Sequence, residues 1–440
     1  MKTRTKQLTA LTLAAALACT ALAGCSTGGD GGKEDGKITI RLLTRMSGTS
    51  HQVDIYNDVI DEFKEKHPEV EIVDDSQGDE AAYNNILKTD MSSGTMANVF
   101  RIQGVANLGK YIDEGYIADM TPFLEEDSEW GGGFTEGALN YYRVPGKDGI
   151  YGIPCEAGLI GIYYNERILK ECGVDTFPET WTEFKDAIEK IKAKDYTPIA
   201  LGAKSTYMAG HLHDLIFYRW MGTEAAKQLG NRELKWTDEE VVETLQFEKD
   251  LYEMGAFPEG TAGINEDIVK TDFQNGKAAM LITGPWNITN FNDPEVCPEA
   301  ENIRLAKFPY FEEKPEYKNE DMQVTSPYMV NGKLEGEELE LTVELVKMLT
   351  CKETAERFAN ETSQLIPRTD LDVDESMVDP LFTTNVELCA DSTGVAVDIF
   401  DFDPLASMQD RTRNSIVSMF TGSTAEAAAE EIQAEIDQAE

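Results

Sequence analysis

The residue best placed to bind a ligand is an indole that follows a short apolar run. Asn275-Gly276 is a turn signal, and the apolar residues from Ala278 to Ile282 come soon after it. Such a run is typical of a strand buried on both faces, as in a parallel sheet. Gly284-Pro285 ends the run, and Trp286 comes next. Because ligands of open α/β sheets bind beyond the carboxyl ends of the strands, Trp286 either presents its flat face to a ligand or fills the core.

Three aspartates have the spacing of a calcium-binding loop. Asp370, Asp372 and Asp374 match the first three ligand positions of such a loop. Glu375 follows where the loop needs a glycine, and Leu381 stands where it needs a bidentate glutamate. Because both requirements fail, the pattern favours a solvated acidic loop, and we predict no metal there.

Other residue types also allow chemistry without indicating a reaction. His211 and His213 are suitably spaced for a metal, but no third ligand is suitably placed, so a core or cleft histidine is favoured. Asp401 and Asp403 are either a catalytic pair or part of a loop, and 81 acidic residues make chance pairs common. Neither a nucleophile elbow nor a phosphate-binding glycine loop is present in the sequence. We therefore expect no catalytic residue, metal or cofactor.

The elements that would position these residues alternate between strand and helix. Alternating or continuous apolar runs predict the strands, and apolar residues at helical spacing predict the helices. This alternation is typical of a parallel, doubly wound sheet. The expected strands are 37–43, 70–73, 99–102, 159–164, 197–202, 278–282, 304–308 and 324–330. The expected helices are 53–63, 83–91, 166–172, 181–194, 211–221, 238–254, 337–349 and 424–439.

The N-terminus has the features of a secretory signal. Lys2, Arg4 and Lys6 precede an uncharged apolar segment at 8–23, which is shorter than a membrane-spanning helix. It ends in Leu-Ala-Gly before Cys25, which resembles the lipobox of bacterial lipoproteins, although an ordinary signal with a chance cysteine is the alternative. We expect a signal peptide at 1–24 and a lipidated Cys25 with a flexible tether at 25–36. The protein would then be extracytoplasmic and held at the cell membrane by lipid alone.

Composition limits the class of partner. A chain of 440 residues exceeds what one hydrophobic core usually serves, so we expect two domains. The formal charge of −42 repels phosphate backbones, which makes nucleic acid an improbable partner. The five cysteines beyond Cys25 are scattered, so most are expected to be buried thiols, and one disulfide bridge stays possible.

An ordered set of segments resembles one known family. These are the lipobox at Cys25, YGIPCEAGLIGIYYNERIL at 151–169, PETWTEF at 178–184, NGKAAMLITGPW at 275–286, LIPRTD at 365–370 and STAEAAAEEIQ at 423–433. Together they span nearly the whole mature chain. The chain resembles the extracellular solute-binding proteins of the carbohydrate-uptake class, the lipoprotein receptors of ABC transporters related to maltose-binding protein.

The resemblance implies an α/β fold of the periplasmic-binding-protein-like type II. It has two lobes joined by three crossovers, which we place near Ile153, Pro309 and Ile366. The first lobe would comprise 37–153 plus 310–365, and the second 154–309 plus 366–440. Hinge closure of such lobes on a ligand is a recognised motion.

The same resemblance assigns ligand contacts. Trp286 matches the family's stacking tryptophan, and Glu156 matches a glutamate that accepts sugar hydroxyls. The remaining implied contacts are Arg45, Met46 and Ser47 after the first strand, Gln103 after the third, Tyr207 and His211 after the strand at 197–202, and Arg411 near the start of the penultimate helix. Near Arg411 the family often has an aromatic residue, whereas here Met408 and Gln409 occupy the region.

The implied function is that of a receptor rather than an enzyme. A monomer would capture a carbohydrate, with an oligosaccharide as the expected cargo, and deliver it intact to ABC transporter permease subunits. One alternative keeps the receptor but gives it a polyol, a glycerol phosphate or a peptide as cargo. Another is a lipid-anchored glycoside hydrolase that uses two carboxylates.

Overall fold

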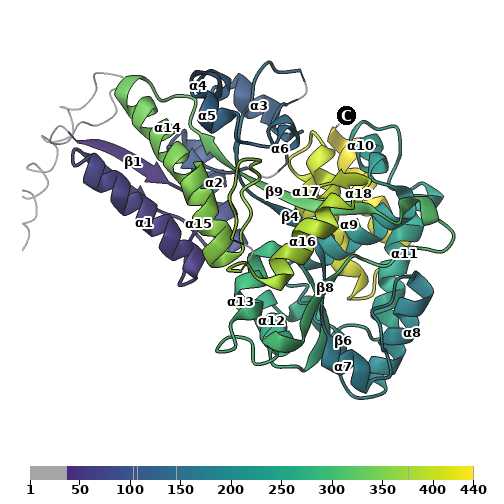
Figure 1. The fold of residues 1–440 in the computed structure, drawn as a ribbon. Helices are drawn as coiled ribbons and strands as arrows, with labels where there is room; N and C mark the ends of the chain where they lie inside the picture. The colour runs from purple at the N-terminus through teal and green to yellow at the C-terminus, as the bar shows by residue number, and fades with distance from the viewer. Residues whose placement is uncertain (1–36, 103, 107, 145, 375, 440) are drawn as a thin grey trace, which may run out of the picture. The chain divides into compact units, whose positions relative to one another are not determined.

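The elements follow the alternation expected from the sequence. The computed structural model describes residues 37–102, 104–106, 108–144, 146–374 and 376–439, so the signal, Cys25, the tether and Gln103 lie outside the described residues. The chain divides into two units, Met1–Ile38 and Thr39–Glu440, and every helix and strand except the first residue of β1 belongs to the second unit. Figure 1 labels these helices and strands.

The strands are spread along the chain and are separated by helices in most places. They are β1 (Ile38–Leu42), β2 (Val70–Asp74), β3 (Val99–Phe100), β4 (Ile153–Leu159), β5 (Gly161–Asn165), β6 (Thr197–Ile199), β7 (Ala278–Thr283), β8 (Ile303–Ala306), β9 (Glu320–Val330) and β10 (Gly394–Ala396). The strands expected from the sequence are all present, with ends displaced by a few residues. Two strands, β4 and the short β10, were not expected.

Helices connect and cover the strands. The first half of the chain forms α1 (His51–Lys66), α2 (Glu80–Ser93), α3 (Leu108–Asp113), α4 (Thr121–Glu126), α5 (Ser128–Gly131), α6 (Glu136–Tyr141), α7 (Glu166–Glu171), α8 (Trp181–Lys192) and α9 (Tyr207–Met221). The second half forms α10 (Glu224–Gly230), α11 (Glu239–Glu253), α12 (Glu266–Gln274), α13 (Ile288–Asn292), α14 (Gly336–Thr350), α15 (Lys352–Thr362), α16 (Pro380–Ala390), α17 (Met408–Met419) and α18 (Ala425–Ala439). Each helix expected from apolar spacing is confirmed.

The residues that precede α7 and α8 cap the N-termini of these helices. Thr180 and Glu183 form the expected capping box at α8, in which each side chain accepts a hydrogen bond from the other residue's backbone N–H. Asn165 caps α7 by accepting from the Ile168 N–H, as expected. These caps fix the residues at which α7 and α8 begin.

The first sheet contains strands from both ends of the chain. Its order is β10-β9-β3-β1-β2, and β4 also pairs with β9. β1 runs parallel to β3, whereas β9 is antiparallel to both β3 and β4. α1 packs against α14 and α15, so helices distant in sequence lie side by side next to this sheet (Figure 1).

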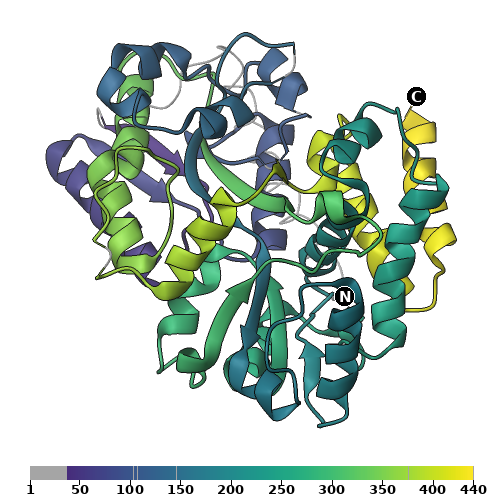
Figure 2. The ribbon, with the colours of Figure 1, turned by 45° about the vertical axis from the view of Figure 1, so that its right-hand side comes forward.

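The second sheet has the order β6-β7-β5-β8. β6 and β7 are parallel, but β5 is antiparallel to β7 and to β8. All six residues of β7 are buried, as its apolar run indicated. α9 packs against α11 and α17, and α17 against α18, which Figure 2 shows as a group of neighbouring helices.

The expectation of purely parallel sheets was wrong, because both sheets are mixed. Alternating strands and helices indicate crossover connections within a sheet. They do not reveal that Ile160 alone separates β4, in the first sheet, from β5, in the second. Nor do they reveal that β9 belongs to the first sheet again. β5 and β9 run against several of their neighbours, and these strands make the sheets mixed.

β4 was missed because its sequence, IPCEAGL, contains a proline and two polar or small interruptions. Proline lacks the N–H that a ladder needs and usually indicates an edge or a bulge. The pairing of β4 with β9 does shift register between Pro154 and Glu156. This irregularity therefore lies at Glu156, one of the ligand contacts expected from the sequence.

The cysteines of the described residues are all free. These five thiols form no disulfide, so the bridge left possible by the sequence is absent. Within the same part of the chain, no helix is long and apolar enough to cross a membrane.

Candidate functional site

A cavity of about 430 Å³ lies where loops from both sheets meet. This volume falls within the range typical of small-molecule sites. The first sheet contributes the loop after β1, the start of α2, and residues of β4 and β9, whereas the second contributes the turn after β7 and the starts of α9 and α12. The lining residues are Thr44, Arg45, Met46, Ser47, Gln52, Gly78, Asp79, Glu80, Arg101, Cys155, Glu156, Tyr207, His211, Glu266, Asp267, Lys270, Trp286, Val324, Thr325, Ser326, Tyr328, Gln364, Val397, Asp398, Asp401 and Arg413.

The structure brings most of the expected contact residues together. Those that line the cavity are Arg45, Met46, Ser47, Glu156, Tyr207, His211 and Trp286. They come from segments separated by as many as 241 positions in the chain, from Arg45 to Trp286. Gln103 lies outside the described residues.

Arg411 does not line the cavity. Its Nε donates to Glu435 at 3.2 Å, and its side chain is 41% exposed. Arg413 lines the cavity instead. Residues two positions apart on an α-helix differ by about 200° around its axis, so they point to nearly opposite sides. The expected position was therefore displaced by half a turn of α17.

The indole of Trp286 is held by the turn after β7. Trp286 lies in a single 3-10 turn, Pro285–Asn287, and is partly buried. A Cβ built at Gly284 would lie 2.1 Å from an indole carbon of Trp286, so only glycine allows the ring to rest against the backbone there. The ring packs on the apolar core and also lines the cavity.

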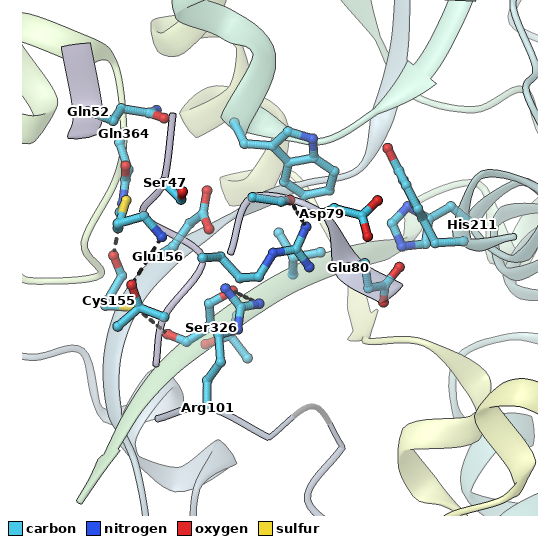
Figure 3. A pocket seen from close by; sticks show the side chains of 18 of the residues that line it. Ser47, Gln52, Asp79, Glu80, Arg101, Cys155, Glu156, His211, Ser326 and Gln364 are labelled. Atoms are coloured by element: carbon cyan, nitrogen blue, oxygen red, sulfur yellow. Dashed lines mark hydrogen bonds between the residues drawn. The ribbon is translucent and has the colours of Figure 1, made fainter. Parts of the chain in front are cut away.

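Arg45, Arg101 and Glu156 form a charged group on one side of the cavity. Arg45 Nη2 donates to the Gly78 carbonyl at 2.6 Å, and Arg101 Nη2 donates to Ser326 Oγ at 3.0 Å. Burial raises the pKa of Glu156, although Arg101 and Arg45 oppose that rise. Burial and then repulsion from Arg101 lower the pKa of Arg45. Figure 3 shows Glu156 beside Cys155, with Arg101 below them.

Arg413 organises the other side of the cavity. Its Nη1 donates to Glu80 at 3.1 Å, and its Nη2 donates to Asp398 at 3.3 Å. Burial would lower the pKa of Arg413, but Glu80 and Asp398 outweigh burial and raise it. Burial would likewise raise the pKa of Glu80, but Arg413 lowers it. The ion pair between Glu80 and Arg413 joins α2 to α17.

Two more carboxyl groups lie close to Asp398. Asp401 and Asp214 are each 3% exposed. Tyr141 donates to Asp401 Oδ2 at 3.4 Å, and the Ile399 N–H donates to Asp214 Oδ1 at 3.4 Å. Burial, followed by the charge of Asp398, raises the pKa of Asp401 and of Asp214 well above the usual range.

Tyr207 and His211 occupy the first two turns of α9. Tyr207 Oη donates to Glu266, which also pairs with Lys270 at 3.2 Å. The ring of His211 is 6.2 Å from that of Trp286, between centroids, and its Nε2 is 3.6 Å from Asp398 Oδ1. Burial lowers the pKa of His211, which favours the neutral imidazole.

The remaining candidates from the sequence lie elsewhere. His213 and Glu248 are a fully buried pair, with 3.4 Å between Nδ1 and Oε2, and neither residue lines the cavity. Asp403 pairs with Arg232, and Asp370 pairs with Arg368. Over the described ranges, no three histidine, cysteine or carboxylate side chains are grouped to hold a metal ion.

Several cavity residues were not expected from the sequence. Glu80 and Arg101 follow strands of the first sheet, so the rule that ligands bind at carboxyl ends of strands could have indicated them. Asp398 follows β10, a strand that the sequence did not predict, and Arg413 lies on α17, so this rule could not indicate either residue. Asp401 was considered only together with Asp403, as a catalytic pair or as part of a loop.

The cavity therefore combines a flat aromatic face with many hydrogen-bonding groups. Carboxylates accept hydrogen bonds, guanidinium groups donate them, and Ser326, Thr325 and Gln364 do both. A buried polar group left unpaired costs roughly 1–3 kcal/mol, so such a lining selects a ligand that is polar around most of its edge.

Comparison with known sequences shows which proteins this chain is similar to. The family model described as "Bacterial extracellular solute-binding protein" matches residues 49–350. The Multiple sugar-binding protein of Streptococcus mutans is 26% identical over 278 residues, which cover 60% of this chain and 61% of that protein. The Galactooligosaccharide-binding protein of Bacillus subtilis is 24% identical over 237 residues, which cover 51% of this chain and 50% of that protein. The chain thus spans between half and two thirds of the length of these curated relatives.

Solved structures resemble nearly the whole chain. A chitin oligosaccharide binding protein superposes with a TM-score of 0.83 at 23% identity, covering 92% of this chain and 98% of that one. A maltose-bound T. maritima MalE3 superposes with a TM-score of 0.74 at 19% identity, covering 92% and 100%. At these identities the likeness concerns the fold. It confirms the expected two-lobed α/β class.

Proposed function

Because the chain belongs to the family of bacterial extracellular solute-binding proteins, we propose that its cavity captures a sugar for an ABC importer. The cargo is an oligosaccharide, which the protein delivers intact to the permease subunits. The relatives named for sugar binding support this cargo class. The family's extracellular location places the protein's activity outside the cytoplasm.

The observation that carries the proposal is the partly buried indole of Trp286 among the polar residues that line the cavity. A sugar ring has an apolar C–H face and a rim of hydroxyl groups. Trp286 suits the first, and Glu156, Arg45 and Gln364 suit the second. The expected ligand contacts Met46, Ser47, Tyr207 and His211 complete the proposed lining.

Capture proceeds by closure of two lobes around the sugar, without breaking a bond. We propose lobes at 37–153 plus 310–365 and at 154–309 plus 366–440. The chain passes from the first sheet to the second around Ile160 and returns before β9, which supports the proposed crossovers near Ile153 and Pro309. Closure converts binding energy into a population shift toward the state that the permease recognises.

The protein acts as a monomer held by a lipid on Cys25. The lipid anchor is proposed from the apolar leader, from Leu22-Ala23-Gly24 before Cys25, and from the glycine-rich segment that follows. These features are typical of a tethered receptor, which must stay near its permease while it captures solute.

A thermal-shift screen tests the proposed function. A ligand that binds the folded protein raises its stability in proportion to RT ln(1 + [L]/Kd). Monosaccharides and oligosaccharides are compared with polyols, glycerol phosphate and short peptides. We expect the largest rise in Tm from a sugar. When the protein is incubated with oligosaccharides, we expect no release of shorter sugars. A larger rise from a polyol, phosphate ester or peptide would replace the cargo, and sugar release would indicate a glycoside hydrolase.

A further inference from the structure

Carboxyl groups are concentrated on the side of the cavity that contains Asp398. Asp398 accepts from Arg413, and Asp214 and Asp401 lie close enough that the charge of Asp398 acts on both. Arg413 also pairs with Glu80. One guanidinium group therefore pairs with two carboxylates, Glu80 and Asp398, whose combined charge exceeds its own.

Buried polar atoms on this side lack partners. Asp401 Oδ1, Asp214 Oδ2 and His211 Nδ1 are buried, and within the described part of the chain they have no hydrogen-bond partner. Asp401 is 3% exposed and His211 is 5% exposed, and both line the cavity. Unsatisfied buried groups of this kind are rare in native proteins and call for an explanation. A ligand that brings hydrogen-bond donors and positive charge to this side would supply one.

A hydroxyl group and an ammonium group differ in how well they suit these carboxyl groups. A hydroxyl donates one hydrogen bond and carries no charge. An ammonium group donates three and carries one positive charge. Next to partly buried carboxylates, hydrogen bonds that involve charged groups are roughly twice as strong as neutral ones. Asp398 itself is only partly buried, with 14% of its side chain exposed, so a ligand can reach it.

The negative charge lies beside the stacking surface. The His211 ring is 6.2 Å from the Trp286 ring between centroids, and His211 Nε2 is 3.6 Å from Asp398 Oδ1. A sugar ring stacked on Trp286 would therefore carry its substituents toward Asp398. Figure 3 shows His211 and Glu80 on one side of the cavity and Glu156 with Cys155 on the other.

We propose that the carboxyl cluster of Asp398, Asp401, Asp214 and Glu80 around Arg413 is a subsite for a positively charged amino group, so that the preferred cargo is an amino sugar or an oligosaccharide that contains one. This inference rests on the proposed function of sugar capture. The formal charge of −42 on the whole chain favours the same choice, because a negative field attracts cationic ligands and repels anionic ones.

Matched sugars test the subsite by isothermal titration calorimetry on the full folded chain. Each set differs at one carbon, where it has a hydroxyl, an ammonium or an N-acetyl group. The sets are glucose, galactose and mannose with their 2-amino and 2-acetamido derivatives, and β-1,4-linked tetramers of glucose, glucosamine and N-acetylglucosamine. We expect an amino member to bind at least ten times more tightly than its hydroxyl and N-acetyl counterparts.

Two variants locate the effect. Asp398→Asn keeps an oxygen that can accept from Arg413 but removes the charge, so the preference for the amino member should fall to about threefold or less. Asp410→Asn is the matched control, because Asp410 is exposed on α17, pairs with Lys88 and does not line the cavity. It should keep the preference of the unmodified chain. The Tm of each ligand-free variant confirms that it is folded.

The outcomes distinguish the amino subsite from sugar capture itself. Neutral sugars that bind as tightly as their amino counterparts would overturn the amino subsite and leave sugar capture intact. An amino preference that survives in Asp398→Asn would also overturn it, because the cluster would not be its source. If no amino sugar binds, the subsite is overturned, and if no sugar of any kind binds in the wider screen, the proposed function fails as well.

Discussion

The indole of Trp286 rests against the backbone at Gly284, where no side chain intervenes. The residue packs against the core and also lines the cavity. The sequence predicted the position of this residue, because an apolar run and a Gly-Pro turn indicate a strand end. It left two roles open, since burial on each side of a ring depends on segments distant in the chain.

Replacement of Trp286 by alanine should weaken sugar binding at least tenfold. The loss follows because an aromatic side chain contributes a large apolar contact area and a ring face. Calorimetry with the best sugar of the screen measures it. Trp220→Ala is the matched control, since Trp220 is also partly buried but does not line the cavity, and its affinity for the sugar should be unchanged. Equal binding by Trp286→Ala and the unmodified chain would assign Trp286 to the core alone.

The arginine on α17 was predicted two residues from the one that lines the cavity. The approximate position of a helix can be inferred from apolar spacing, but the face that meets a ligand depends on its rotation within the fold. α9 packs against α17, and α11 packs against α18. These contacts set the rotation of α17. The residues of α17 alone do not indicate this packing.

Among the elements, α8 shows how much local chemistry can predict. The spacing of Thr180 and Glu183 predicted a capping box, and the structure contains it. Thr180→Ala should lower the free energy of unfolding by about 1 kcal/mol, because it leaves a helix N–H without its acceptor. Urea denaturation measures the change. Glu183→Gln keeps an acceptor oxygen and should cost less, and an equal or larger loss would contradict the role of the box.

The buried pair between α9 and α11 predicts a dependence of stability on pH. Burial raises the pKa of Glu248 well above the usual range and lowers the pKa of His213 to about 3. The folded chain then holds a proton on Glu248 that the unfolded chain releases above its ordinary pKa. Stability from this group is present below that ordinary pKa and is lost as pH rises.

Glu248→Gln should therefore stabilise the protein more at pH 8 than at pH 5. Thermal unfolding of both chains across this range measures the difference in Tm. Glu253→Gln is the matched control, because Glu253 is exposed on the same helix and its replacement should have a small effect at either pH. A difference in Tm that shrinks as pH rises would mean that Glu248 is ionised in the folded chain.

At the scale of the whole molecule, alternation of strands and helices correctly predicted an α/β class but not the mixed sheets. β5 and β9 carry the chain from one sheet to the other, and their directions depend on where the chain re-enters each sheet. The segments that supply Asp398 and Arg413 to the cavity, the end of β10 and α17, come late in the chain and pack against elements distant in sequence. Their place in the site therefore could not be inferred from spacing along the chain.

Sugar binding should also change the dimensions of the molecule. If two lobes close on the ligand, the radius of gyration measured by small-angle X-ray scattering should fall when the chain is saturated with its sugar. The ion pair Glu80–Arg413 joins α2 to α17 and would act in the same direction as closure. The same measurement with a sugar that gives no thermal shift is the control. An unchanged radius at saturation would mean that capture involves no closure.

A crystal structure with the best sugar of the screen tests the central claim most directly. We predict one sugar ring stacked on the indole of Trp286, with hydroxyl groups bonded to Glu156 and to the arginines of the cavity. A sugar bound elsewhere, with Trp286 sealed from it by other side chains, would contradict the claim.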